Sequence, residues 1–82
     1  MKARVVITLK PGVLDPQGKA IAQSLGSLGF TEVGEVRLGK YIEIELEGRS
    51  REEMLGQVDT MCRQLLANPV TELYRFEVEE AK

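Results

Sequence analysis

The stretch that decides the fold is Val33 to Glu47, which reads V-G-E-V-R-L-G-K-Y-I-E-I-E-L-E. From Val36 onward its apolar residues occupy even positions and its glutamates odd ones. Such alternation is typical of a β-strand with one buried face. A single strand of this length would span about 50 Å, whereas a compact chain of 82 residues has a radius of gyration of about 12 Å. A continuous strand would therefore overshoot its own domain and need a partner chain to cover it.

A hairpin that turns near Gly39 is the competing interpretation. A two-residue loop would set apolar Val36 opposite charged Glu43, against the logic of strand register. A three-residue loop over residues 39–41 restores apolar pairs, such as Val36 with Ile44. The unbroken parity nevertheless favours one long strand that bends at the glycine.

Two helices flank this stretch, and both carry clear boundary signals. Asp15 is suited to cap the first helix with Pro16 at its first position, and Gly29 suits the left-handed residue that ends it. The apolar face of this helix consists of Ile21, Leu25 and Leu28. The second helix begins at a capping box, Ser50 to Glu53, and stops at Asn68-Pro69.

Two further strands complete the order of elements. Residues Ala3 to Leu9 and about Thr71 to Glu79 both show strand-like alternation. The order is β-α-β(-β)-α-β, which predicts an α+β fold with two helices on one face of an antiparallel sheet. We expect a single domain over residues 1–82, a sandwich related to the ferredoxin-like fold, whose long bent central strand is covered by a partner chain.

The composition excludes several kinds of chemistry. The chain has one cysteine, Cys62, and no histidine, which rules out disulfides within the chain, structural zinc sites and histidine-assisted catalysis. Cys62 lies in an apolar helix face, where a cysteine is typically a small buried hydrophobe. We therefore expect no catalytic and no metal-binding residues. Chains this short bury only about 60% of their unfolded surface, so association with other chains is a natural source of stability.

Charge and hydropathy exclude other classes of protein. The net charge is −2, from eleven basic and thirteen acidic residues, which disfavours a nucleic-acid binder. No apolar run approaches the length of a membrane span. The first residues already follow a strand pattern and show no signal peptide, so a cytoplasmic protein is expected.

A candidate contact surface lies within the long strand. Arg37 and Lys40 flank Gly39, and Tyr41 follows them. Arginine and tyrosine are over-represented at interface hot spots. Arg37 and Tyr41 share odd parity, so we expect both on the outer face of the sheet beside the glutamates. An ordinary solvated bend explains the same residues equally well.

Four motifs together resemble the PurS family, the small subunit of phosphoribosylformylglycinamidine synthase. They are L-D-P-Q-G-K-A at 14–20, L-G-F at 28–30, V-R-L-G-K-Y at 36–41 and N-P-V at 68–70. They occur in the right order over essentially the whole chain. The combination of D-P-Q-G with R-x-G-K is much more specific than either piece.

The resemblance implies a role within a larger enzyme. That enzyme converts formylglycinamide ribonucleotide, glutamine and ATP into formylglycinamidine ribonucleotide, glutamate, ADP and phosphate. A large synthetase subunit uses the ATP and Mg²⁺, and a glutaminase subunit releases ammonia. The PurS subunit has no catalytic residues and no cofactor of its own, and it joins the other two and helps ammonia pass between them.

The resemblance also implies partners and contact residues. The family forms homodimers in which the second helix and last strand are exchanged, and larger assemblies such as homotetramers also occur. Asp15, Gln17 and Gly18 of the first motif thus join Arg37, Lys40 and Tyr41 as candidate contacts with partner subunits.

Two other functional classes stay open. A stand-alone ferredoxin-like regulatory module would bind an amino acid or nucleotide near Asp15 to Lys19. An RNA-binding sheet is a weaker alternative, because such sheets expose aromatic and basic residues, whereas this strand exposes Glu43, Glu45 and Glu47.

Overall fold

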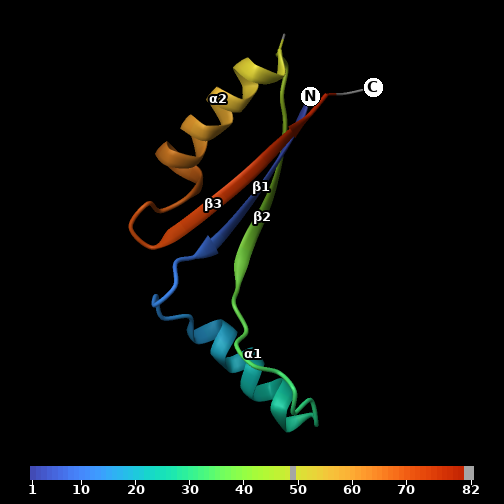
Figure 1. Ribbon diagram of the computed structural model, residues 1–82, viewed down its shortest axis with the longest axis vertical. Helices are drawn as coiled ribbons and strands as arrows, with labels where there is room; N and C mark the ends of the chain where they lie inside the picture. Colours follow the sequence, from blue (N-terminus) through green and yellow to red (C-terminus); the bar gives the residue numbers. More distant parts are fainter. Residues whose placement is uncertain (49, 81–82) are drawn as a thin grey trace.

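The computed structural model describes residues 1–48 and 50–80 and confirms the α+β class (Figure 1). The elements follow in the order β1 (Lys2–Leu9), α1 (Pro16–Ser27), β2 (Gly39–Glu45), α2 (Arg51–Met61), a π-helical segment η1 (Cys62–Leu66) and β3 (Glu72–Glu79). No helix in these described ranges has the length and apolar character to cross a membrane.

The three strands form one antiparallel sheet with β1 at its centre and the order β2-β1-β3. Val5 of β1 is paired with Ile42 on one side and Phe76 on the other, so the apolar positions of all three strands share one face. The alternation that predicted each strand therefore also sets the register between them.

The core lies between this apolar face and α2. Val5 and Ile7 of β1 are fully buried, as are Val58 and Cys62 from the α2–η1 segment. Fully burying a side chain such as valine or isoleucine contributes about 1.5–3 kcal/mol relative to leaving it in water. Ser50 caps α2 by accepting the N–H of Glu53 at 3.1 Å, which confirms the predicted helix start.

Helix α1 has the ends that were predicted. The Asp15 carboxylate accepts the N–H of Gly18 at 2.8 Å. At the other end Gly29 has a φ of 99°, and the N–H of Phe30 donates to the Leu25 carbonyl at 3.0 Å. With the second bond from Gly29 to Gly26, this is a Schellman motif.

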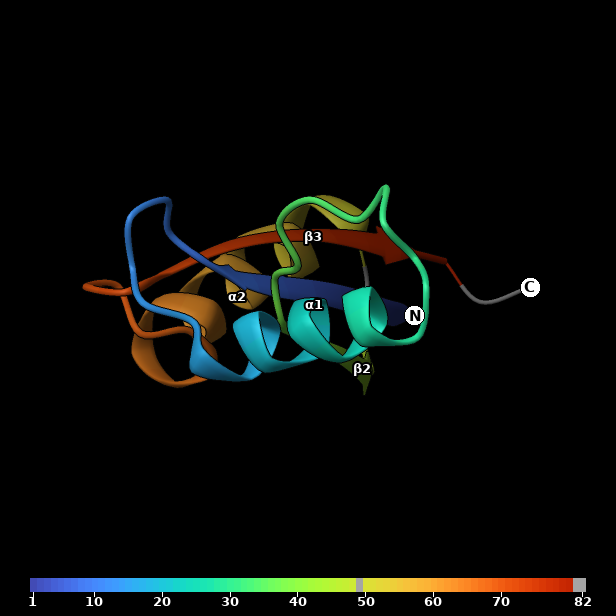
Figure 2. The same ribbon diagram turned by 90° about the horizontal axis from the view of Figure 1, so that it is seen from below.

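The position of α1 differs from the prediction that both helices cover one face. Only α2 packs on the sheet, and α1 lies beyond the end of the strands (Figures 1 and 2). We call residues 14–38, which contain α1 and the segment that returns from it, the arm. The chain measures 51 × 30 × 14 Å with a radius of gyration of 16.3 Å, against about 12 Å for a compact chain of this size. The segments on either side of α1 lead away from the sheet, so the helix cannot reach it.

The Val33–Glu47 stretch forms no hairpin within the chain. The last residue pair of β1 and β2 is Thr8 with Gly39, and the chain from 33 to 38 runs on beyond the end of β1. The hydrogen-bonded strand is therefore shorter than the 15-residue strand predicted, because residues 33–38 have no neighbouring strand among the described residues. Within this chain α2 packs on β3 and β3 pairs with β1, whereas the arm stands apart from the sheet. The exchange of segments between two chains stays a prediction.

Candidate interaction site

Cys62 occupies the interior, as predicted. Its side chain is fully buried, and burial raises the pKa of the thiol, with the negative charge of Asp59 adding to the effect. A protonated, inaccessible thiol is a poor nucleophile. In the described part of the chain, no three histidine, cysteine, aspartate or glutamate side chains are grouped closely enough to hold a metal ion.

Three of the six predicted contact residues meet where the arm leaves the sheet, a junction that we call the neck. Here the chain crosses outward through residues 9–15 and inward through residues 36–39. Asp15 links the two crossings, because one carboxylate oxygen accepts the N–H of Gly18 and the other accepts the N–H of Leu38, both at 2.8 Å. These hydrogen bonds, that from Leu38 first, lower the pKa of Asp15, and the nearby Arg37 cation acts in the same direction.

Arg37 links the inward crossing to the end of β1. One guanidinium nitrogen donates to the carbonyl oxygens of Leu9 and Lys10, both at 2.9 Å, and another pairs with Glu35 at 3.1 Å. The prediction that Arg37 lies on the outer face of the sheet with Tyr41 is therefore wrong. The ladder between β1 and β2 ends at Gly39, so Arg37 lies past it and reaches carbonyl groups that no strand partner occupies.

Gly18 explains much of the D-P-Q-G motif in structural terms. A methyl group at this position would overlap the Val36 carbonyl oxygen and the Asp15 carboxylate. Glycine is therefore required for α1 to approach the returning chain closely. Gln17, by contrast, is exposed on the first turn of α1.

A hollow of about 430 Å³ lies beside the neck. Its charged lining residues are Asp15, Lys19, Glu35 and Arg37. This is the place where the regulatory-module hypothesis expects a ligand. Asp15 and Arg37 already bind backbone groups of the chain, however, so half of this polar lining is engaged in holding the neck together.

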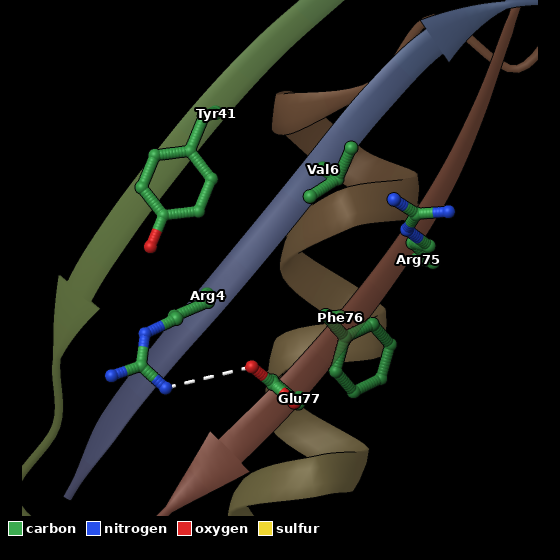
Figure 3. Close-up of a pocket in the computed structure, with 6 residues that line it drawn as sticks. All are labelled: Arg4, Val6, Tyr41, Arg75, Phe76 and Glu77. Atoms are coloured by element: carbon green, nitrogen blue, oxygen red, sulfur yellow. Dashed lines mark hydrogen bonds and ion pairs between the residues drawn. The ribbon is translucent and has the colours of Figure 1, made fainter.

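The face of the sheet opposite α2, which we call the open face, carries Tyr41 (Figure 3). Tyr41 is 57% exposed and is paired with Val6 of β1, which is paired in turn with Arg75 of β3. These three residues line a hollow of about 320 Å³, together with their neighbours Arg4, Phe76 and Glu77. A tyrosine beside an apolar residue, within a rim of charged groups, is the usual composition of a protein–protein contact.

The charges of the open face are largely paired. Arg4 contacts Glu79 at 2.6 Å and Glu77 at 3.5 Å, and Lys2 contacts Glu43 at 2.5 Å. Lys40 does not belong to this face. It is paired with the buried Ile7 and lies on the α2 side, 3.6 Å from Glu72.

Sequence reasoning missed the exposed apolar surface of the arm, because it placed both helices on one face of the sheet. Leu14 is 78% exposed, Leu28 73% and Phe30 58%, and Ile21 and Val33 are also exposed. Large apolar side chains gathered on a detached segment are typical of a surface that another chain covers. The length of the Val33–Glu47 stretch was the signal that could have located this surface, because a strand of that length runs past its own domain.

The fold and these surfaces define a small α+β interaction domain with an unpartnered arm. Residues 2–80 match the family model described as "PurS: Phosphoribosylformylglycinamidine (FGAM) synthase". The chain belongs to the PurS family, as the motifs predicted.

Similar proteins of known sequence and structure agree with this assignment. The phosphoribosylformylglycinamidine synthase subunit PurS of Synechocystis is 51% identical over 92% of this chain and 75% of its own. The crystal structure of Methanocaldococcus jannaschii PurS has a TM-score of 0.89 at 44% identity, covering 99% of this chain and 98% of that one. A chain in the structure of PurLQS from Thermotoga maritima has a TM-score of 0.85 at 33% identity, covering 93% of each chain.

Proposed function

We propose that this chain is the PurS subunit of a phosphoribosylformylglycinamidine synthase in purine biosynthesis. The match to the PurS family over residues 2–80 supports this most directly, and the likeness to a chain of the PurLQS structure supports membership of such a complex. In this role the chain is a non-catalytic bridge between a synthetase subunit and a glutaminase subunit in the cytoplasm. In that complex the synthetase subunit binds and uses ATP and Mg²⁺, and this chain holds no cofactor of its own.

A bridge of this kind contributes to the reaction by geometry. Ammonia released at one active site has to reach the other before it is protonated or lost to water. Holding the two sites in a fixed relation raises the effective concentration of ammonia at the acceptor. The hydrogen bonds of the neck suit that role, because they tie the arm to the end of the sheet.

The arm supports a homodimer as the assembled form. Residues 33–38, which precede Gly39, run past the end of β1 without a strand partner. The outer edge of β2 has no neighbour within the described chain. Two copies that pair antiparallel around Lys40 place Val36 of one chain opposite Ile44 of the other. That is the register of the three-residue hairpin, now formed between chains, and it buries apolar residues together.

In the same register, α1 of one chain lies over the β2 side of the other chain's sheet, next to α2. Ile42 and Ile44 of β2 are only partly buried there, which leaves apolar surface for the exposed Ile21 and Leu28 to cover. Each sheet would then gain a fourth strand and a second helix. The predicted sandwich with two helices on one face would form between two chains.

The open face is our candidate for contact with the other subunits. Tyr41 and Val6 provide its apolar centre, and Arg75 at its side is exposed. Docking there would leave the arm and the α2 face free for the second copy. One chain could therefore take part in both contacts at once.

Reconstitution tests the proposed function. The purified chain alone should turn over neither glutamine nor formylglycinamide ribonucleotide. Added to the synthetase and glutaminase subunits, it should restore glutamine-dependent synthesis and have a smaller effect on synthesis from supplied ammonia. Turnover of any of these substrates by the chain alone would contradict the proposal.

Calorimetry separates this function from the regulatory-module alternative. The isolated chain is titrated with formylglycinamide ribonucleotide, ADP and glutamine in turn. A bridge should bind none of them tightly by itself. Tight binding that is lost in Lys19→Met, a change within the neck hollow, would favour the regulatory module.

A further inference from the structure

The hydrogen bonds of the neck fix the direction in which the arm leaves the sheet. Asp15 holds Leu38, 23 residues away, and Arg37 holds Leu9 and Lys10, 28 and 27 residues away. All three hydrogen bonds involve a charged group, and hydrogen bonds of this kind are stronger than those between neutral groups. The outward and inward crossings are therefore joined to each other as well as to the sheet.

The same sequence has a second arrangement in which the arm closes on its own sheet. A hairpin over residues 39–41 would fold the segment 33–38 back along β2 and bring α1 beside α2 of the same chain. Arg37 would then lie opposite Glu43, which is level with Arg4 in the sheet. Arg4 is five residues, or roughly 17 Å, from Leu9 along β1, so Arg37 could not reach the Leu9 and Lys10 carbonyl groups from there. The hydrogen bonds of Arg37 at the neck exist only in the open arrangement.

The residues of the turn also oppose closure. A three-residue hairpin loop usually needs a left-handed residue at its third position, which here is Tyr41. Tyrosine rarely adopts that conformation, and no residue other than glycine has a positive φ among the described residues. Gly39, the first residue of that loop, lies close against β1 in this structure, where a methyl group would overlap the Ile7 carbonyl oxygen.

We infer that Asp15 and Arg37 form a latch that holds the arm open and so directs it to a second copy of the chain. The inference rests on the homodimer proposed above. It adds the reason why the arm packs on a second copy of the chain instead of folding back on its own sheet. Without the latch, the same apolar contacts would be available within one chain, where no second copy has to be captured.

Distances measured within single chains test the latch. Spin labels are attached at Ser24→Cys on α1 and Gln57→Cys on α2, both exposed positions, in a Cys62→Ala background. Labelled chains are mixed with an excess of unlabelled chains, unfolded and refolded together, so that pulsed electron paramagnetic resonance reports distances within one chain. The chain with its latch intact should give one long distance.

Latch variants should add a short distance. In Asp15→Asn and Arg37→Met the ratio of closed to open arms should rise at least about tenfold, as expected from losing a hydrogen bond to a charged group. Glu35→Gln is the matched control, because it removes one charge from the neck but leaves the Arg37 bonds to Leu9 and Lys10.

The outcomes separate the latch from the dimer. Folded Asp15→Asn and Arg37→Met chains with the distance distribution of Glu35→Gln would overturn the latch alone. If the chain with an intact latch gives a short distance between the two spin labels and light scattering shows a monomer, the proposed dimer is overturned. Should the latch variants fail to fold, Arg37→Lys replaces them: it keeps the charge but loses the planar fork, and an unchanged distribution in it overturns the latch.

Discussion

The Asp15 carboxylate accepts the backbone N–H of Leu38 at 2.8 Å, across 23 residues of sequence. This hydrogen bond, together with that from Gly18, lowers the pKa of Asp15 from its ordinary value of 3.8. A carboxyl group with a depressed pKa in the folded chain stabilises that chain at pH values above its ordinary pKa. The stabilisation is lost as the pH falls through the pKa of the folded state.

We therefore expect the neck to loosen in acid before the core unfolds. The protection factor of the Leu38 amide against hydrogen exchange should be constant above about pH 5 and should fall below the ordinary pKa of the carboxyl group. Nuclear magnetic resonance measures it residue by residue, with the amide of Val5 in β1 as the internal reference. In Asp15→Asn the protection of Leu38 should be low at every pH. Acid-stable protection in the unaltered chain would contradict this role of Asp15.

Substituting two glycines of α1 should have opposite effects on stability. Gly18→Ala places a methyl group against the Val36 carbonyl oxygen, so α1 and the returning chain have to separate. Gly26→Ala meets nothing within 4 Å and should gain about 0.5–1 kcal/mol from helix propensity. Thermal unfolding should therefore show a lower melting temperature for Gly18→Ala and a higher one for Gly26→Ala. Equal stabilisation by both would mean that the close approach at the neck is not needed.

The Cys62 thiol should react only when the chain opens. It is fully buried and its pKa is raised, so reaction with a thiol reagent should be slow in buffer and should accelerate with denaturant in step with unfolding. Cys62→Ala should cost about 1–3 kcal/mol of stability through the cavity it leaves. It should leave the activity of the reconstituted complex unchanged. Loss of that activity in a folded variant would give the thiol a role that its position does not suggest.

The Tyr74 hydroxyl should titrate above the ordinary range of a tyrosine. The Tyr74 hydroxyl donates to the Asp59 carboxylate at 2.6 Å, and this hydrogen bond, with burial, raises the pKa of Tyr74 from its ordinary 10.0. The bond stabilises the fold fully below the ordinary pKa, and its contribution is lost as the pH rises through the raised value. In Tyr41→Phe, tyrosinate absorbance should appear above pH 10.0. Adding Asp59→Asn should move the titration of Tyr74 back toward its ordinary pKa. An unchanged titration would contradict the role of the hydrogen bond between Tyr74 and Asp59.

The local parts of this fold could be predicted from the sequence because their causes are local. The cap at Asp15, the Schellman motif at Gly29 and the capping box at Ser50 each depend on a few neighbouring residues, and each is present. Strand register follows in the same way from apolar parity. These features need no knowledge of the rest of the chain.

The position of the arm could not be predicted in that way. The apolar stripe of α1 indicates only that something covers it, not whether the cover is the same chain or another. Arg37 illustrates the difficulty for single residues, because its parity placed it on the outer face, whereas the end of β1 offered it two free carbonyl groups. The family motifs pointed to Asp15, Gly18 and Arg37 as contacts with partner subunits, and that role stays a prediction. The structure shows instead that these residues hold the neck together.

Tyr41 and Lys40 offer a test of which face of the sheet meets the other subunits. They are neighbours on β2 but lie on opposite faces, Tyr41 beside Val6 and Lys40 above Ile7. If the open face is the contact, Tyr41→Ala should lower the affinity for the synthetase and glutaminase subunits about tenfold or more, the usual effect at a tyrosine hot spot. Lys40→Ala is the matched control, with little effect on that affinity. Surface plasmon resonance, with the synthetase and glutaminase subunits immobilised, measures the affinities of the two variants. Light scattering checks that both variants keep the assembly state of the unaltered chain. Equal losses in both variants, or a loss in Lys40→Ala alone, would move the contact away from the open face to the side that carries α2.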